Sequence, residues 1–397
     1  MSQRTSSRWV VWGFSALGLV WGMYAAALPD IQRRTGVSDP LLGAAMASMS
    51  VTALPVMTAA GRLGVRRPGI LTASTVLFGI AAPLAAYARS PVALFAALLA
   101  VGGGSAAFDV GINTAAARHE RHFSVSIMNR SHASFSLFLL VGSLSMGALF
   151  SLGVPVALPL TVVGVALVAT APFLGRLVGT GSGPGSHSRR PPVARALRKV
   201  VVRAGSIVAL ALVVENGLQQ WSAIFLERQL FASPAVASLG PATLAAAAVA
   251  GRGAAHGVRR RVRPHVLLRI GAGLAVPGVV ALATAQLTVV ALAGLALAGA
   301  GISVASPVVV SYAGRSAEPG QEARTISDST AIGYVGLFGG PAAVGTVSGM
   351  IGLRAGVALL GLAALAVAVL AGVVQTRPSC DGPVGDGPVG DGPVSEG

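Results

Sequence analysis

Charged residues are scarce in this chain of 397 residues, making up 11% of it, against about 25% in an average soluble domain. This shortage excludes an ordinary soluble protein. Aromatic residues are also few, at 5%, whereas 53% of the residues are hydrophobic and 52 are glycines. Small and aliphatic side chains in these proportions are typical of packed membrane helices and exclude a disordered chain.

The chain has one cysteine, Cys380, which lies in a polar C-terminal tail. A disulfide framework and a cysteine-based metal site are therefore excluded. Acidic residues are outnumbered by basic ones, 13 to 29, and the net charge is +16. Because the basic residues fall between apolar runs and do not gather on one face or segment, we expect no nucleic-acid partner.

Apolar runs long enough to cross a bilayer recur along the chain. A helix needs about 20 apolar residues to cross roughly 30 Å of hydrocarbon. Twelve runs meet this requirement, at residues 8–29, 40–60, 69–88, 92–116, 127–152, 156–174, 203–226, 235–251, 266–285, 288–313, 326–350 and 354–374. The first run is longer than the apolar part of a signal peptide, and we expect it to be an uncleaved helix. The sequence predicts an all-α membrane protein with twelve transmembrane helices.

Most basic residues lie in alternate connections between these runs. The other connections hold only Arg33, Arg34, Arg89, Arg228 and Arg354. Cytoplasmic loops carry the excess of arginine and lysine in membrane proteins. We therefore expect both termini to be cytoplasmic and the chain to be a multi-pass protein of the cytoplasmic (inner) membrane.

A polar segment after the sixth run divides the chain into two halves of six runs each. There Gly, Ser, Pro and Arg replace Ala, Leu and Val, which is typical of a linker. We predict an N-terminal six-helix bundle at residues 1–176, a cytoplasmic linker at 177–202, a C-terminal six-helix bundle at 203–375 and a disordered cytoplasmic tail at 376–397. The tail repeats Asp-Gly-Pro-Val three times, a composition that cannot bury a core.

The two halves share short sequence features. Residues 61–68 (GRLGVRRP) follow the second run, and residues 251–253 (GRG) follow the eighth. Parallel six-helix repeats with a substrate site at their interface are the plan of one large transporter class. Two Gly-x-x-x-Gly patterns, at residues 18–22 and 345–349, predict close packing of helices.

These features resemble the major facilitator superfamily, and more closely its fucose-permease-like bacterial branch. The acid-x-x-x-Asn pattern in the fourth helix of that branch is matched by Asp109 and Asn113, and residues 215–222 and 333–341 are also similar to it. The resemblance extends to about Val374. It implies two six-helix bundles around a central cavity.

The same resemblance implies that basic residues of the cytoplasmic loops act in gating. They are Arg62, Arg66, Arg67 and Arg252. The aspartate usual in the family's loop after helix 2 is absent from residues 61–69, which departs from conventional loop gating. Helix 1 has no buried acid, because Asp30 lies at its outer end, so the expected proton site lies elsewhere.

Ionisable residues inside a membrane are costly unless they are paired or hydrated, so each one suggests a site. Asp109 and Asn113 share a face of the predicted fourth helix, and His132 lies at a similar depth on the fifth. Because histidine titrates near neutrality, we expect these three residues to carry proton coupling. The alternative is a structural clasp formed by the same side chains with Arg130; for Arg130 and Glu120, which lie nearer the surface, the clasp is favoured.

Polar residues also cluster near the middle of the predicted seventh helix. Glu215, Asn216, Gln219, Gln220 and Trp221 offer acceptors, donors and an aromatic surface, which suit a sugar-like or other polar solute in a substrate cavity. For the amide side chains the alternative is hydrogen bonding between helices.

The sequence as a whole predicts a proton-coupled secondary transporter that moves a small solute by rocking of its two halves. One alternative is a proton-antiport exporter of a drug or secondary metabolite, and another is a sensor with a transporter fold. No metal-ligand cluster, catalytic base or phosphate-binding loop is visible, so we expect neither enzymatic activity nor a cofactor. We expect a monomer whose partners are its small-molecule substrate, protons and the lipid bilayer.

Overall fold

The computed structural model describes residues 2–63, 68–177, 195–258, 262–317 and 321–374, and within these ranges the chain is helical with short connections. The helices are α1 (Gln3–Thr35), α2 (Asp39–Leu63), α3 (Pro68–Ala81), α4 (Leu84–Tyr87), α5 (Pro91–Phe123), α6 (Met128–Ser151), α7 (Ala157–Gly175), α8 (Arg195–Leu230), α9 (Pro234–Ala237), α10 (Leu239–Val258), α11 (Pro264–Thr284), α12 (Thr288–Ile302), α13 (Ala305–Arg315), α14 (Glu322–Ile351), α15 (Leu353–Leu370) and a 3₁₀ turn, η1 (Ala371–Val373). Twelve spans of this described part are long and apolar enough to cross a membrane. The prediction of an all-α protein with twelve transmembrane helices is confirmed.

The first helix extends beyond its predicted limits of residues 8–29. It continues through Pro29 to Thr35 and ends at Gly36, whose φ of 65° is left-handed and whose N–H donates to the carbonyl of Gln32. Proline is tolerated inside membrane helices because neighbouring groups satisfy the carbonyl that it leaves free. Pro29 therefore does not end this span.

The seventh span also begins earlier than expected. Helix α8 starts at Arg195, inside the segment 177–202 that was predicted to be linker. Residues 195–202 (RALRKVVV) contain neither glycine nor proline, and Arg, Ala, Leu and Lys favour helix. The rest of the predicted linker (178–194), like residues 375–397 with Cys380 and the tail repeat, lies outside the described residues.

Two spans are interrupted near a proline. Pro83 separates α3 from α4 in the third span, and in the tenth span α12 ends at Ile302 while α13 begins at Ala305. Pro307 has no N–H to donate to the carbonyl of Ser303, four residues earlier, so that carbonyl is left without its helical donor. This carbonyl can therefore accept a hydrogen bond from a side chain, as described for the candidate site below.

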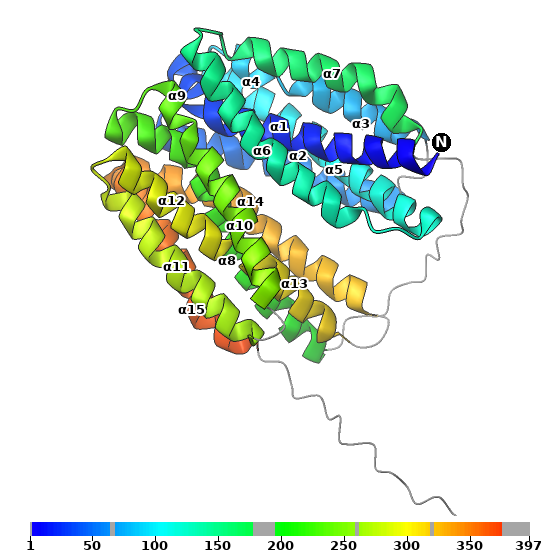
Figure 1. Cartoon of the computed structure of the whole chain (residues 1–397). Coiled ribbons are helices and arrows are strands. Elements are labelled where there is room, and N and C mark those ends of the chain that lie inside the picture. Colours follow the sequence, from blue (N-terminus) through cyan, green and yellow to red (C-terminus); the bar gives the residue numbers. More distant parts are fainter. Residues whose placement is uncertain (1, 64–67, 178–194, 259–261, 318–320, 375–397) are drawn as a thin grey trace, which may run out of the picture.

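The helices form two groups, α1–α7 and α8–α15 (Figure 1). The groups meet at the end of the molecule opposite the N-terminus and diverge toward the end that carries it. We call these the far end and the terminal end. Helices α1, α6 and α8 begin at the terminal end.

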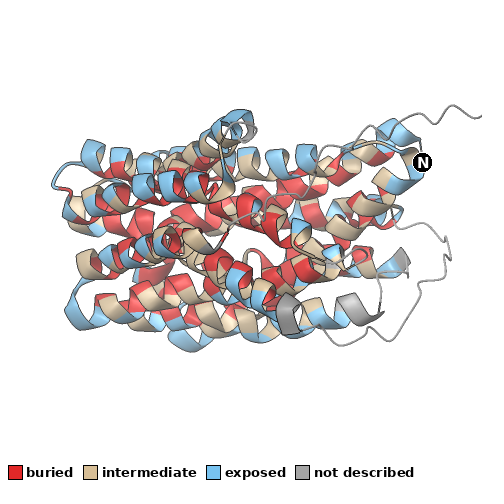
Figure 2. Ribbon diagram, turned by 90° about the horizontal axis from the view of Figure 1, so that it is seen from below, coloured by how far each residue is buried: buried red, intermediate tan, exposed pale blue. Residues whose placement is uncertain are grey.

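The outer faces of the helices are apolar as well as exposed. Figure 2 shows the buried residues concentrated inside and the exposed ones outside. The exposed group includes Val92, Val165, Leu362 and Val369. A hydrophobic outer surface on long apolar helices is what lipid requires. The chain is therefore a multi-pass membrane protein.

Close packing of α1 on α6 depends on two glycines. A Cβ atom added at Gly18 would overlap the backbone carbonyl of Phe135, and one at Gly22 would overlap that of Leu139. This confirms the packing role predicted for the first Gly-x-x-x-Gly pattern.

We expect Gly22→Ala to destabilise the protein by about 1–3 kcal/mol, because the added methyl forces α1 away from α6. The melting temperature of the purified protein in detergent measures the effect. Gly273→Ala is the matched control, since nothing lies within 4 Å of a Cβ added to Gly273. Equal melting temperatures for the two variants would contradict the packing role of Gly22.

Candidate functional site

The two halves touch through glycines near the far end. A Cβ at Gly43 of α2 would lie 3.2 Å from the Cα of Ala342 on α14, and one at Gly349 would overlap Pro40. A Cβ at Gly147 of α6 would overlap Ser238, which lies between α9 and α10. The second Gly-x-x-x-Gly pattern thus packs α14 of one half onto α2 of the other, as predicted.

A buried carboxylate links the halves at the same end. Asp39, the first residue of α2, accepts a hydrogen bond from Gln32 Nε2 at 2.7 Å, and it also accepts from Arg228 at the end of α8 and from Ser348 near the end of α14. Gln32 and Asp39 belong to the first half, whereas Arg228 and Ser348 belong to the second. We call these four residues the latch.

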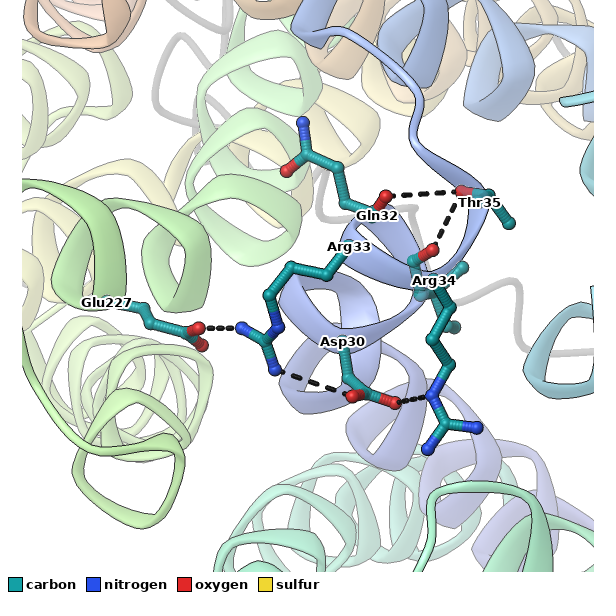
Figure 3. A network of polar contacts seen from close by, with 7 residues as sticks. Asp30, Gln32, Arg33, Arg34, Thr35 and Glu227 are labelled. Atoms are coloured by element: carbon teal, nitrogen blue, oxygen red, sulfur yellow. Dashed lines mark hydrogen bonds and ion pairs between the residues drawn. The ribbon is translucent and has the colours of Figure 1, made fainter. Parts of the chain in front are cut away.

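A second contact between the halves lies beside the latch. Arg33 of α1 forms ion pairs with Glu227 of α8 and, at 3.4 Å, with Asp30 on its own helix. Figure 3 shows Arg33 between these two acids, while Arg34 binds the other oxygen of Asp30 at 2.6 Å. Because Arg33 is half exposed, this pair alone contributes little to stability. Its importance is that it joins α1 to α8.

Asp109 lies within α5, 14 residues before the helix ends at Phe123, or about 21 Å along its axis. Asn113 Nδ2 donates to Asp109 Oδ1 at 3.0 Å and to its backbone carbonyl at 2.9 Å. Tyr334 of α14, in the second half, is close enough to interact electrostatically with Asp109. None of the described basic residues forms an ion pair with Asp109.

His132 is exposed, and its ring packs edge-on against Phe14, with 5.0 Å between the ring centroids. It interacts electrostatically with Arg252 of the second half. No hydrogen bond joins it to Asp109 among the residues that the structure describes, because α1 packs against both α5 and α6 and keeps most of their lengths apart. Arg130 lies with Arg4 and Arg8 at the terminal end. The four-residue clasp is therefore not formed.

Glu215 and Arg252 form an ion pair within the second half. Arg252 Nη2 lies 2.5 Å from Glu215 Oε1, and Arg252 Nε donates to the carbonyl of Ser303 at 3.3 Å. This is the carbonyl that Pro307 leaves without a helical donor. The guanidinium thus connects α8, α10 and the interruption between α12 and α13. Both side chains of the pair are partly exposed, at 38% for Arg252 and 21% for Glu215.

The other residues predicted for the cavity have different surroundings. Asn216 Nδ2 donates to the carbonyl of Leu212 at 3.3 Å, and Gln220 is half-buried. Gln219 Nε2 is buried and has no hydrogen-bond partner in the described part of the chain, so it is a donor that a bound solute can satisfy. Trp221 is fully buried and donates its indole N–H to the carbonyl of Pro341 at 3.0 Å, which commits it to packing α8 on α14.

Glu120 and the arginines predicted to act in gating are the remaining predicted residues. Glu120 Oε1 accepts from the backbone N–H groups of Ile127 and Met128 and thereby caps the start of α6. Arg252, expected in the loop after the eighth span, is inside α10, where it gains the partners just described. Arg62 lies in the last turn of α2 and its side chain is not described, and Arg66 and Arg67 lie outside the described residues.

Sequence reasoning did not identify the latch. Its charged members, Asp39 and Arg228, lie at span ends that the basic-residue distribution placed on the same side of the membrane. Their shared side of the membrane is the sequence signal that makes them candidates for a contact with each other. The sequence contains no local pattern that pairs Asp39 with Ser348, because 309 residues separate them.

Comparison with known proteins supplies the family. The sequence profile of the Major Facilitator Superfamily matches residues 10–341. An uncharacterized MFS-type transporter of Yersinia pestis is 27% identical over 369 residues, covering 91% of this chain and 93% of that protein. Membrane protein MosC of Rhizobium meliloti is 27% identical over 358 residues, covering 88% of this chain and 85% of MosC.

Solved structures share the fold at low sequence identity. A bacterial homologue of the human lysosomal transporter Spinster, in an inward-facing and unoccupied conformation, aligns with a TM-score of 0.73 and 16% identity, covering 94% of this chain and 96% of that one. The D323A mutant of the nucleoside transporter NupG aligns with a TM-score of 0.74 and 13% identity, covering 94% of this chain and all of NupG. The twelve helices therefore adopt the arrangement of known transporters.

Proposed function

Because the chain belongs to the Major Facilitator Superfamily and is a membrane transporter by its family and its spans, we propose that it is a proton-coupled secondary transporter of a small polar solute. It acts in the cytoplasmic membrane, with both termini cytoplasmic, as a monomer of two bundles, 1–176 and 203–375. Its branch of the family is the fucose-permease-like one, as the motif around Asp109 indicates. The solute moves by alternating access between the two bundles.

The environment of Asp109 carries the proposal of proton coupling. A carboxyl group inside the membrane without a basic partner is costly when ionised, so binding a proton there is favourable. Asn113 orients the carboxyl, and Tyr334 of the other half is close enough to interact with it electrostatically. A proton bound at Asp109 therefore changes the electrostatics between the halves. His132, opposite Arg252, is the second group of the proposed relay.

Alternating access is supported by where the halves touch. The latch and the glycine contacts hold the far end together, whereas the helices diverge toward the terminal end. A solute that enters from the terminal end meets side chains of both halves at mid-depth. We propose that Glu215, Arg252 and Gln219 contact it, with Asn216 and Gln220 beside them.

The test is transport by the purified protein in proteoliposomes that carry a pH gradient, with protein-free vesicles as the control. Sugars, other polar metabolites and amphipathic drugs are offered in turn, and internal pH is followed with a trapped dye. Accumulation of a solute together with proton entry supports the proposal. Proton exit during solute entry would identify an antiporter. Solute flux that does not depend on the pH gradient would refute proton coupling. Solute binding without transport would identify a sensor.

We expect Glu215→Gln to reduce solute binding or transport about tenfold without unfolding the protein. The substitution removes the charge that holds Arg252, so the guanidinium loses its orientation. Glu322→Gln, which neutralises an exposed acid in the first turn of α14, is the control. Normal transport by Glu215→Gln from pH 5 to pH 8, the range in which histidine titrates, would make Glu215 a packing residue.

A further inference from the structure

A pocket with three arginines opens at the terminal end of the first half. Its volume is about 530 Å³, and it is separate from the Glu215 and Asp109 sites. Its lining consists of Gln3, Arg4, Ser7, Arg8 and Val11 from α1 and Arg130 from α6. Every charged side chain of the lining is therefore a cation, and the proposed transport cycle uses none of them.

The positive charge of this pocket is not neutralised within the described part of the chain. None of the described acids forms an ion pair with Arg4, Arg8 or Arg130. Glu120, on the neighbouring helix α5, binds the two backbone N–H groups at the start of α6 through its Oε1 atom. Three like charges around one pocket repel each other, so an anion between them is favoured.

The two helices that form the pocket add to its positive potential. Gln3 and Arg4 lie in the first turn of α1, and Arg130 is the third residue of α6. Both helices thus present their N-terminal ends here, where the helix dipole is positive. The basic excess of cytoplasmic loops explains why arginines occur at this end, but it does not explain their convergence on one pocket.

One wall of the pocket is fixed by a buried hydrogen-bond chain. Ser7 Oγ donates to the carbonyl of Gln3 at 2.9 Å, so it accepts from His119 Nε2, also at 2.9 Å. The other ring nitrogen of His119 is hydrogen-bonded to Ser6 Oγ at 2.9 Å. His119 is therefore a buried link between α1 and α5. It holds the first turns of α1 in place, and the pocket exists before any ligand binds.

The depth of the pocket matches the surface of the bilayer. Residues 3–8 are polar, and the apolar run begins directly after them at Trp9, followed by Trp12. Tryptophan is enriched at the membrane interface, so the arginines lie at the level of lipid headgroups. Basic pockets between transmembrane helices on the cytoplasmic side suit anionic headgroups.

We propose that this pocket binds a phosphate group, carried either by an anionic lipid such as phosphatidylglycerol or by a free anion. The guanidinium groups of Arg4, Arg8 and Arg130 bind the phosphate oxygens, since arginine matches their geometry with paired N–H donors. The side chain of Val11 gives the pocket an apolar wall, against which the glycerol and first acyl carbons of a lipid pack. Of the two ligands, the lipid is the one that contacts both the arginines and the apolar wall.

The test uses the full-length protein purified in detergent, with all three arginines replaced in Arg4→Gln/Arg8→Gln/Arg130→Gln. Phosphatidylglycerol, phosphatidylcholine and inorganic phosphate are titrated separately, and binding is measured by native mass spectrometry and by the rise in melting temperature. The matched control is Arg121→Gln/Arg198→Gln/Arg203→Gln. It removes the same charge from exposed arginines at the same end that do not line the pocket.

We expect the wild-type protein and the control to bind phosphatidylglycerol more tightly than phosphatidylcholine, and the pocket variant to lose about tenfold or more of that affinity. Inorganic phosphate that binds without a lipid preference, and is lost in the pocket variant, would assign the site to a free anion. Equal loss in both variants would show a general surface attraction and overturn the proposal, as would the absence of binding by either probe. The melting temperature without ligand reports whether each variant is folded.

Discussion

Replacing Asp109 by asparagine is expected to abolish accumulation of the solute driven by a pH gradient, by at least about tenfold, while exchange of solute across the membrane continues. The asparagine keeps the size of the side chain and its position beside Asn113, but it cannot bind and release a proton. In the proposed mechanism, proton movement and solute contact use different side chains, so we expect solute binding to survive the substitution. Gradient-driven uptake and counterflow exchange, measured in the same proteoliposomes, separate the two steps.

The control for this experiment is Asp328→Asn. Asp328 is a partly exposed acid on α14 whose carboxylate lies 3.6 Å from Arg324. It tests whether loss of any carboxylate impairs transport. Retention of gradient-driven accumulation by Asp109→Asn would move coupling elsewhere, with Glu215 as the next candidate, and would leave Asp109 a structural residue.

Replacing Asp39 by asparagine is expected to shift the protein toward states that are open at the far end, on the order of tenfold. The buried carboxylate accepts from Gln32, Arg228 and Ser348, and its neutral replacement cannot satisfy all three donors. The donor that asparagine leaves unsatisfied destabilises the closed far end. This free-energy cost is smaller when the halves separate, because water then bonds to these groups. The contacts between Gly43 and Ala342 then open as well.

An introduced cysteine reports this opening. In a Cys380→Ser background, Ala342→Cys places a thiol in the contact between α2 and α14, and its rate of labelling by a water-soluble maleimide measures exposure. Asp328→Asn is the control, because Asp328 pairs with Arg324 of its own helix and takes no part in the contacts described between the halves. A labelling rate that Asp39→Asn leaves unchanged would show that the glycine contacts alone keep the far end closed.

The twelve spans followed from the sequence because the length of an apolar run is a local property that the bilayer fixes. Their ends were less predictable. Thr35 and Arg195 lie in polar turns that extend a helix beyond the hydrocarbon, where hydropathy has no signal. The linker and tail boundaries stay predictions, since residues 178–194 and 375–397 are outside the described part.

Contacts between residues of one helix were more predictable than contacts between helices. Asp109 and Asn113 are four residues apart on one helix, so their contact follows from helical geometry. The pairing of Glu215 with Arg252 depends instead on how α8 packs against α10, and the attachment of Arg252 to Ser303 depends on a helix interruption around Pro307. Such contacts arise only from tertiary packing, which one sequence without relatives does not encode in any local pattern.

The attachment of Arg252 to the carbonyl of Ser303 has a mechanical consequence. The guanidinium of Arg252 connects α8, α10 and the interrupted tenth span to one another at mid-depth. In the proposed transport cycle we expect the second half to turn as a rigid body, so that the contacts between the halves change and its interior does not. We expect a solute that binds Glu215 in place of Arg252 to break this connection between the three helices. We therefore expect binding of a solute at the proposed site to make the second half less rigid.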